Sequence, residues 1–348
     1  MRSERKTEHL RWAINTLDGP DSSGFEDVTL LNDSVPELGM DDIDLSYSFL
    51  GKKLACPVII NALTGGTDEA AEINRGLASL AHKYGLAMAV GSQTIALERP
   101  GLDKSFAVVR DMNPEGVILA NVSANSSVED CLAAVDMIAA DGLQLHFNVP
   151  QELAMNEGDR NFRGILENVG LITQACPVPV IAKEVGFGFS QESALKLFNC
   201  GVRIFDNGGK GGTNFLAIEG HRGGRLSQGL SNWGISTAAS LGEILALKLP
   251  VQIIASGGIR QASDLAKAIA MGAELVGIGG FFLKILLQEG IQELDQRLDQ
   301  LFYQTKAVFL MAGAADCMEI KKKPVIILGR TAEWLKTRGI DPVQWCRS

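Results

Sequence analysis

Short apolar, β-branched runs alternate with amphipathic segments from about residue 55 to residue 310. Eight of these runs are typical of buried strands, at 58–62, 87–91, 117–121, 143–148, 180–183, 203–206, 253–256 and 275–278. The segments between them have helical periodicity, as at 127–140 and 190–200. Three serines that precede such segments are predicted helix N-caps: Ser126, Ser190 and Ser236. Continuous apolar strands alternating with helices predict a parallel sheet covered by helices.

Eight strand–helix units favour closure into a (β/α)₈ TIM barrel over an open, doubly wound sheet. A Rossmann sheet would carry G-x-G-x-x-G directly after its first strand, whereas Leu63-Thr64-Gly65-Gly66 follows the first strand here. We therefore predict an α/β barrel over residues 51–310. Residues 1–50 are predicted to form an irregular N-terminal segment that partly closes the active site. Residues 311–348 are predicted to form a C-terminal helical tail.

The composition agrees with a core-forming, acidic protein. Of the 348 residues 46% are hydrophobic, and 32 Lys+Arg against 41 Asp+Glu give a net charge of −9. This charge argues against nucleic-acid or anionic-membrane partners, which usually require a basic face. No apolar run reaches the roughly 20 residues of a membrane span, and the charged N-terminus does not resemble a signal peptide.

The positions of the cysteines and histidines indicate the cellular compartment and argue against a zinc site. The six cysteines are scattered without a C-x-x-C pair, which predicts reduced thiols in a cytoplasmic protein rather than disulfides. The four histidines lie far apart in the sequence, and none has a second ligand at zinc spacing. We therefore expect no zinc site.

Polar side chains follow nearly every predicted strand, where TIM barrels form their active sites. The candidates are Thr64, Ser92, Gln93, Asn121, His146, Asn148, Gln151, Glu152, Lys183 and Thr213. Buried polar atoms need partners, so such a set is costly for a pure scaffold. We expect a polar ligand to lie across the mouth of the barrel.

Two glycine pairs indicate where a phosphate group would bind. Gly257-Gly258 follows the seventh strand and Gly279-Gly280 follows the eighth. In this fold these two loops and a helix N-terminus commonly form a phosphate site, because glycine lets backbone N–H groups approach the anion. The alternative is that the glycines only close tight turns. The two pairs together, with Gly211-Gly212-Thr213 after the sixth strand, favour the phosphate site.

Two charged residues near this mouth are open to two interpretations each. Lys183 ends the fifth strand, where burial requires an anionic or electron-rich partner. The alternative to a ligand contact is an ion pair with Glu184 or Asp206, and strand alternation argues against Glu184. Glu152 lies in the loop after the fourth strand, where a carboxylate beside a phosphate is a natural Mg²⁺ ligand. An exposed loop acid is the alternative there.

The N-terminal segment carries three further candidates. Arg5, Lys6 and His9 have a spacing that places Arg5 and His9 on one face if residues 4–17 are helical. Such a set can clamp a diphosphate, since arginine offers bidentate pairing. A merely solvated terminus is the alternative.

Several motifs occur in order over residues 4 to 285. The most specific are Lys-Glu-Val-Gly-Phe-Gly at 183–188 and Gly-Gly-Lys-Gly-Gly-Thr-Asn-Phe at 208–215. They accompany Asn-Ala-Leu-Thr-Gly-Gly at 61–66, His-Phe-Asn-Val-Pro-Gln-Glu at 146–152 and Ser-Gly-Gly-Ile-Arg at 256–260, the last of which other FMN barrels share. Together these motifs resemble the type 2, FMN-dependent isopentenyl-diphosphate isomerase family.

The resemblance implies a TIM barrel that interconverts isopentenyl and dimethylallyl diphosphate for isoprenoid biosynthesis. It implies reduced FMN and Mg²⁺ as cofactors, NADPH or another reductant for the flavin, and a homo-oligomer of tetramer size or larger. The implied FMN contacts are Ala62, Leu63, Thr64, Ser92, Asn121, Lys183, Thr213, Gly257, Gly258, Gly279 and Gly280. The implied substrate contacts are Arg5, Lys6, His9, Ser92, Gln93, His146, Asn148 and Gln151, with Glu152 on Mg²⁺.

Two residues depart from the family pattern. Leu63 stands where the family usually has Met, which is a tolerable apolar exchange. Thr94 stands where the family tends to carry Arg or His. We therefore expect diphosphate binding to depend more on Arg5, Lys6 and Mg²⁺.

The chemistry of the implied reaction favours a flavin over side chains. An unactivated alkene is a very weak base, and its cationic transition state needs electron density beside it. A reduced flavin offers a proton at N5 and an electron-rich ring face. Our hypothesis is that reduced FMN is the acid/base, that Gln151 and His146 orient the substrate as catalytic residues, and that Lys183 stabilises flavin charge near N1–C2.

Two rival functions stay open at the level of sequence. An FMN oxidoreductase on the same barrel would oxidise a 2-hydroxy acid or a dihydropyrimidine. A non-catalytic phosphate-binding module would purify colourless. A visible spectrum and a flavin redox measurement separate all three.

Overall fold

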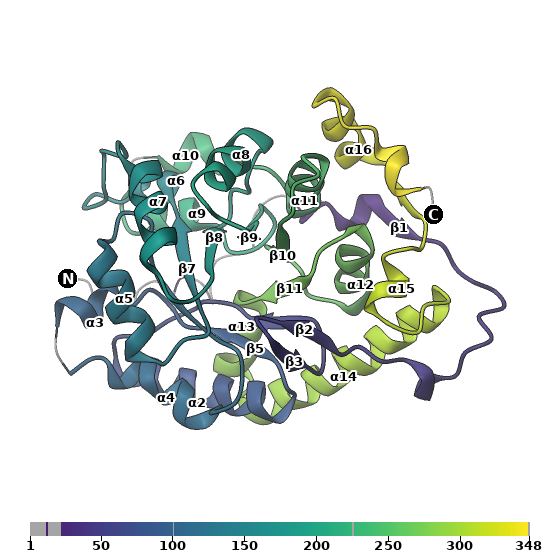
Figure 1. Cartoon of the computed structure of the whole chain (residues 1–348), viewed down its shortest axis with the longest axis horizontal. Coiled ribbons are helices and arrows are strands. Elements are labelled where there is room, and N and C mark those ends of the chain that lie inside the picture. Colours follow the sequence, from purple (N-terminus) through teal and green to yellow (C-terminus); the bar gives the residue numbers. More distant parts are fainter. Residues whose placement is uncertain (1–11, 13–21, 100, 225, 347–348) are drawn as a thin grey trace.

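Eight parallel strands close into a barrel in the computed structural model, which describes Trp12 and residues 22–99, 101–224 and 226–346. The strands are β4 (Val58–Ile60), β5 (Ala87–Ala89), β6 (Ile118–Ser123), β7 (Gly142–Phe147), β8 (Val180–Glu184), β9 (Ile204–Asp206), β10 (Gln252–Ser256) and β11 (Leu275–Ile278). They neighbour one another in chain order, and β11 pairs with β4 to complete the ring (Figure 1). All eight predicted strands and the predicted TIM barrel are confirmed.

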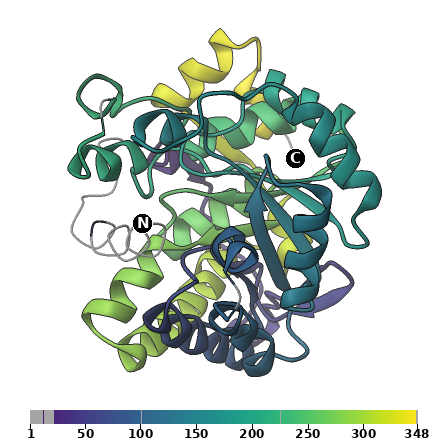
Figure 2. The same ribbon diagram turned by 90° about the vertical axis from the view of Figure 1, so that its left-hand side faces the viewer.

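Helices surround this barrel (Figures 1 and 2). The longer ones are α2 (Asp68–Lys83), α4 (Lys104–Met112), α5 (Val128–Met137), α7 (Ile165–Ala175), α8 (Gln191–Asn199), α11 (Thr237–Ala246), α12 (Ala262–Met271), α13 (Gly280–Gln288), α14 (Ile291–Met311) and α16 (Gly329–Thr337). Shorter helices are α3 (Thr94–Glu98), α6 (Val149–Ala154), α9 (Phe215–His221), α10 (Ser227–Leu230) and α15 (Cys317–Ile320). None of the described helices has the length and apolar character to cross a membrane.

The helix starts follow local capping chemistry. Ser190 caps α8 as predicted, because its side chain accepts from the Ser193 N–H. Ser236 precedes α11 as predicted, but its side chain makes no cap hydrogen bond. The prediction of Ser126 as a cap is wrong by one residue: Ser127 caps α5, and the Ser126 N–H instead donates to the Ser123 carbonyl in a turn.

One end of the barrel is closed by apolar side chains. The hairpin of β2 (Tyr47–Phe49) and β3 (Lys52–Leu54) packs Phe49 and Leu54 against inward-facing residues such as Ile59, Ile181 and Ile254. Lys52 ties this hairpin to the Gly116 carbonyl, just before β6. The hairpin therefore covers the amino ends of the strands and leaves the carboxyl ends for a site.

Two segments that lie near opposite ends of the sequence pair outside the barrel. Strand β1 (Val28–Leu30) pairs antiparallel with β12 (Val325–Ile327), so the N-terminal segment is less irregular and the tail less purely helical than predicted. Neither three-residue strand is long enough to show a clear alternation in the sequence. Of the predicted helix at 4–17 only Trp12 is described, and it is helical. Arg5, Lys6 and His9 lie outside the described residues.

Candidate active site

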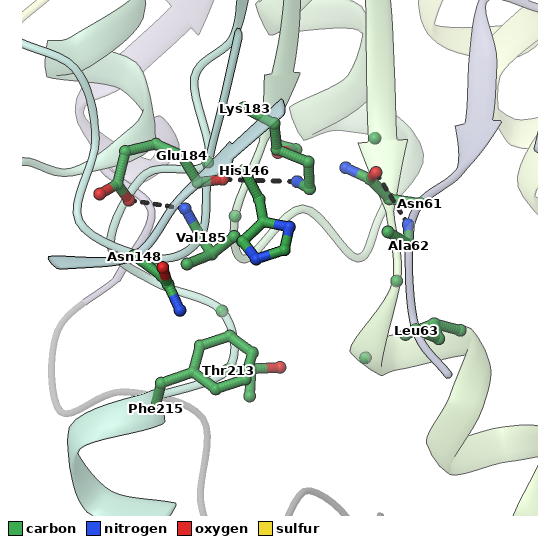
Figure 3. A pocket seen from close by; sticks show the side chains of 18 of the residues that line it. Asn61, Ala62, Leu63, His146, Asn148, Lys183, Glu184, Val185, Thr213 and Phe215 are labelled. Carbon is green, nitrogen blue, oxygen red and sulfur yellow. Dashed lines mark hydrogen bonds between the residues drawn. The ribbon is translucent and has the colours of Figure 1, made fainter. Parts of the chain in front are cut away.

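A cavity of about 300 Å³ lies at the carboxyl ends of the barrel strands (Figure 3). This volume is at the lower end of the range for ligand pockets. Most of the predicted site residues line it: Ala62, Leu63, Thr64, Ser92, His146, Asn148, Gln151, Glu152, Lys183, Thr213, Gly257, Gly258, Gly279 and Gly280. Residues from segments far apart in the sequence therefore meet at one place, as strand-end positions in a barrel should.

Gln93 and Asn121 do not line the cavity. The fully buried Gln93 side chain donates from Nε2 to the Ala134 carbonyl at 2.9 Å and accepts from the Asn121 N–H. Asn121 is also buried, and its Oδ1 lies 2.8 Å from His146 Nδ1. The structure thus places these two predicted contacts behind the wall, where they support His146.

Strand alternation separates Lys183 from Glu184, and the two side chains extend in opposite directions (Figure 3). Lys183 lines the cavity, and its Nζ lies 2.9 Å from Asp206 Oδ2. The ion pair with Asp206 that the sequence left open is present, without removing Lys183 from the cavity wall. A lysine that pairs with a buried carboxylate at the cavity wall is suited to an electron-rich ligand.

The Glu184 carboxylate is bound by its own loop. Its Oε2 accepts from the N–H groups of Val185 at 2.7 Å and Phe187 at 2.6 Å. Burial raises the pKa of Glu184 to about 8, although the backbone donors and nearby Lys183 act in the opposite direction. Glu184 thus stabilises the turn after β8 and does not pair with Lys183.

The glycine loops on the wall have constrained geometry. Gly257 and Gly258 have φ of +110° and +80°, which favour glycine, and a Cβ on Gly258 would lie 2.4 Å from the Gly211 carbonyl oxygen. Arg260 joins the loops by donating to the carbonyls of Gly258 and Gly211, each at 2.8 Å. Tight packing, the alternative left open by the sequence, is therefore real at these glycines.

The same wall also fits a phosphate group. Helix α13 begins at Gly280, and Gly279, Gly280 and Phe281 line the cavity at its N-terminus. The first N–H groups of a helix have no partner within the helix and attract anions. These loops and this helix end are the part of the cavity suited to a phosphate group.

Gln151 is held by a carboxylate that the sequence analysis missed. Gln151 Nε2 donates to Glu219 Oε1 at 3.3 Å, and Arg222 Nη1 lies 2.5 Å from Glu219 Oε2. Glu219 is buried, on α9. The spacing of Glu219 and Arg222, three apart on a helix, indicates an ion pair but gives no sign that it is buried beside Gln151.

Glu152 faces the cavity and is held in place by two hydrogen bonds. It lines the cavity from α6, and its two carboxylate oxygens accept from Asn148 Nδ2 and from the Asp159 N–H, each at 2.9 Å. Among the described residues no three His, Cys, Asp or Glu side chains cluster to hold a metal. A Mg²⁺ here would therefore take one carboxylate and complete its shell with phosphate oxygens and water, which is a usual pattern for this ion.

The N-terminal segment reaches the helix that carries Glu219. Trp12 stacks on His221 at the end of α9, with ring centroids 4.5 Å apart and an interplanar angle of 7°. Helix α9 packs on α6, which carries Gln151 and Glu152. Trp12 is therefore next to the wall that holds the polar cavity residues.

Solved structures with a similar fold include two oxidases, one of which holds an FMN adduct. A lactate oxidase from Pediococcus acidilactici superposes with a TM-score of 0.69 at 18% identity, covering 94% of each chain. A mandelate oxidase variant with an FMN adduct superposes with a TM-score of 0.63 at 16% identity, covering 92% of this chain and 93% of that one. At these identities the likeness shows the barrel fold alone.

Comparison with sequence relatives identifies the family to which the chain belongs. The model of the FMN-dependent dehydrogenase family matches residues 165–327. The isopentenyl-diphosphate delta-isomerase of Moorella thermoacetica is 51% identical, covering 97% of both chains. That of Symbiobacterium thermophilum is 46% identical, covering 98% of this chain and 97% of the relative. With this identity over nearly the whole length, the chain belongs to the isopentenyl-diphosphate delta-isomerase family.

Proposed function

We propose that the protein interconverts isopentenyl and dimethylallyl diphosphate, with reduced FMN bound in the barrel mouth and Mg²⁺ on the diphosphate. The observation that carries the proposal is the shared cavity, in which Lys183, the glycine loops with a helix N-terminus, and Gln151, held from behind by Glu219, face one space. The reaction adds a proton at one carbon and removes another from a neighbouring position. It requires no net oxidation.

The residues present fit FMN. Gly257, Gly258 and the start of α13 would hold its phosphate, and Lys183 would stabilise negative charge near N1–C2 of the ring. Residues 62–64, which line the same cavity, would also contact the cofactor. When bound in its reduced state, FMN supplies a proton at N5 and an electron-rich face beside the substrate alkene.

The side chains of α6 and β7 would orient the substrate. Glu219 fixes the Gln151 amide, so that Gln151 and His146 approach the substrate from one wall. Glu152 would hold Mg²⁺ against the diphosphate. Binding of the reacting groups in fixed positions lowers the entropic cost of the proton transfers.

The N-terminal segment would complete the site. We propose that Arg5, Lys6 and His9 bind the diphosphate as this segment closes over the mouth, excluding water from the cationic transition state. The stacking of Trp12 on His221 supports a position of the segment beside α9. NADPH as the reductant, a cytoplasmic location and a homo-oligomer of tetramer size or larger stay predictions from the sequence.

Product analysis tests the proposed function. The purified yellow protein is reduced with NADPH under anaerobic conditions and given isopentenyl diphosphate and Mg²⁺. We expect dimethylallyl diphosphate, and none when the flavin is kept oxidised or Mg²⁺ is chelated. A colourless protein that binds diphosphates without converting them would instead support a phosphate-binding module.

The match to the FMN-dependent dehydrogenase model favours one second candidate, a flavin oxidase. Such enzymes draw electrons from a 2-hydroxy acid into oxidised FMN and need a base beside N5. We expect lactate, mandelate and dihydropyrimidines to leave the oxidised flavin spectrum of this protein unchanged. Bleaching of the flavin by one of them would favour the oxidase.

A further inference from the structure

A layer of buried polar side chains crosses the barrel interior behind the cavity. Asp206, at the end of β9, is fully buried. Its Oδ2 accepts from Lys183 Nζ at 2.9 Å and from Asn61 Nδ2 at 2.7 Å, and Ser256 donates to its Oδ1. A carboxylate that receives an ammonium and two further donors in the barrel interior can only accept hydrogen bonds.

This carboxylate fixes which way the side-chain amides of Asn61 and Gln144 are turned. Asn61 turns its Nδ2 to Asp206, and its Oδ1 accepts from the Ala62 N–H at 2.9 Å, so neither amide atom can exchange places with the other. Gln144 Nε2 donates to Asn61 Oδ1 at 3.3 Å and to Asp206 Oδ2 at 3.4 Å. Because both of these are acceptors, Gln144 must turn its oxygen the other way.

The orientation of Gln144 in turn fixes that of the Asn121 amide, which faces His146. Gln144 Oε1 accepts from Asn121 Nδ2 at 3.2 Å, across the register pair of β6 and β7. Asn121 therefore presents its oxygen to His146, with 2.8 Å between Oδ1 and Nδ1. An amide oxygen cannot donate, so His146 Nδ1 must carry a proton. Gln144 and Asn121 are buried, which leaves little access for water to replace these partners.

We propose that Asp206 sets the tautomer of His146 through Asn61, Gln144 and Asn121. In the neutral ring the proton is on Nδ1, and Nε2 is the acceptor. Any proton that His146 gains or loses is then on Nε2, the nitrogen turned away from Asn121. Asp206, Gln144 and Asn121 are positioning residues, since they act on the substrate only through a residue of the cavity wall, whereas Asn61 itself lines the cavity.

The importance of this tautomer for turnover rests on the proposed function, whereas the tautomer itself does not. An Nε2 that takes up a proton can donate to a diphosphate oxygen, and an Nε2 that releases it can accept from water or a ring N–H. Nδ1 offers neither, because Asn121 occupies it in both protonation states. The chain therefore confines the titration of His146 to a single nitrogen.

Nitrogen NMR of the histidine rings tests this inference. The FMN-loaded protein is labelled with ¹⁵N in its histidine imidazoles, and the His146 signals are assigned by their loss in His146→Gln. Spectra are recorded at a pH where no imidazolium signal of His146 remains. We expect Nδ1–H alone in the unaltered protein.

Three variants distinguish a hydrogen-bond network that fixes the tautomer of His146 from an effect of burial alone. Asp206→Asn can both donate and accept, so the Nε2–H tautomer should rise to a population comparable with Nδ1–H. Gln144→Met breaks the chain but keeps the Lys183–Asp206 ion pair, and it should cause the same shift. Ser256→Ala removes a donor to Asp206 that is not part of the chain, and it should leave Nδ1–H alone.

Two results would overturn the inference. One is an Nε2–H tautomer in the unaltered protein. The other is pure Nδ1–H in Gln144→Met, which decides the question even if Asp206→Asn does not fold. Absence of dimethylallyl diphosphate in the product assay would refute the proposed function without bearing on the tautomer.

Discussion

Glu184 shows how a site residue can serve the fold instead of the ligand. Its neighbour Lys183 faces Asp206 and the cavity, while Glu184 accepts two backbone N–H groups of its own turn. Since the native state raises the pKa of this carboxyl, the folded protein binds its proton more tightly than the unfolded chain does. Its protonation is therefore coupled to stability.

The sign of this coupling gives a prediction. The contribution of Glu184 is complete below pH 4.5, its ordinary pKa, and is lost as the pH rises through about 8. The difference corresponds to roughly 5 kcal/mol. Urea unfolding between about pH 5 and pH 8 should show the free energy of unfolding falling with pH, with a flatter slope in Glu184→Gln. The exposed Glu69→Gln should keep the original slope, and an equally steep slope in Glu184→Gln would contradict the assignment.

Glu152 provides a prediction about the metal. Glu152→Gln keeps the size of the side chain and can keep the contact with the Asp159 N–H, but it removes the charge that attracts Mg²⁺. We expect Mg²⁺-dependent turnover to fall by at least ~100-fold, as for removal of a group that stabilises transition-state charge. The protein should stay yellow. Steady-state rates over a Mg²⁺ titration check this, with Glu129→Gln on α5 as control; full activity of Glu152→Gln would refute the metal assignment.

At the scale of elements, the loops after β9 and β10 act as one unit. Gly258 meets the Gly211 carbonyl, and Arg260 bonds to both loops. Any side chain at residue 258 would push these loops apart and shift the wall that suits a phosphate. The glycine pair after β10 thus serves packing and, in our proposal, FMN binding together.

Gly258→Ala should therefore weaken FMN binding. The new Cβ would be 2.4 Å from the Gly211 oxygen, on a backbone with φ of +80°. We expect loss of most of the flavin on gel filtration and a fall in stability of about 1–3 kcal/mol. Gly170→Ala in α7 is the matched control, because nothing lies within 4 Å of its new Cβ. It should keep the flavin and gain up to about 1 kcal/mol, and a yellow Gly258→Ala protein would contradict the role of the loop.

The elements that sequence predicted well are those with long-range apolar periodicity. The eight strands and most strand-end residues followed from alternation and from the rule that barrel sites form at carboxyl ends. The direction in which side chains point after a strand was harder to predict. Gln93 turns behind the wall because its side chain donates to the Ala134 carbonyl on α5 and accepts from the Asn121 N–H. Glu219 is brought beside Gln151 by the packing of α9 on α6. Such contacts depend on tertiary packing that no local pattern encodes.

At the scale of the whole molecule, the segments that contain β1 and β12 support each other and one wall of the cavity. Val28 pairs with Ile327 in the β1–β12 sheet, and Thr331 donates to the Gly24 carbonyl. The Ser23 carbonyl accepts from the Ala238 N–H, and the backbone of Ser23 lies against Gly211. The tail thus anchors the chain that follows the predicted diphosphate clamp.

A charged side chain buried in the β1–β12 sheet should therefore weaken substrate binding more than flavin binding. Val28 is buried, so Val28→Asp should lower the free energy of unfolding by roughly 3 kcal/mol. We expect KM for isopentenyl diphosphate to rise several-fold while FMN content stays near that of the unaltered protein. Thr29→Asp, on the exposed face of the same strand, should change stability by no more than about 0.5 kcal/mol. A destabilised Val28→Asp with unchanged KM would show that the tail serves stability alone.

The central claim is that the barrel mouth shifts a carbon–carbon double bond without net electron transfer. Proton NMR of anaerobic, NADPH-reduced protein with isopentenyl diphosphate in D₂O measures this directly, because product and label appear in one spectrum while absorbance follows the flavin. We predict many turnovers to deuterium-labelled dimethylallyl diphosphate with the flavin still reduced at equilibrium. Oxidation of one flavin per product molecule, or an unchanged substrate, would contradict the account.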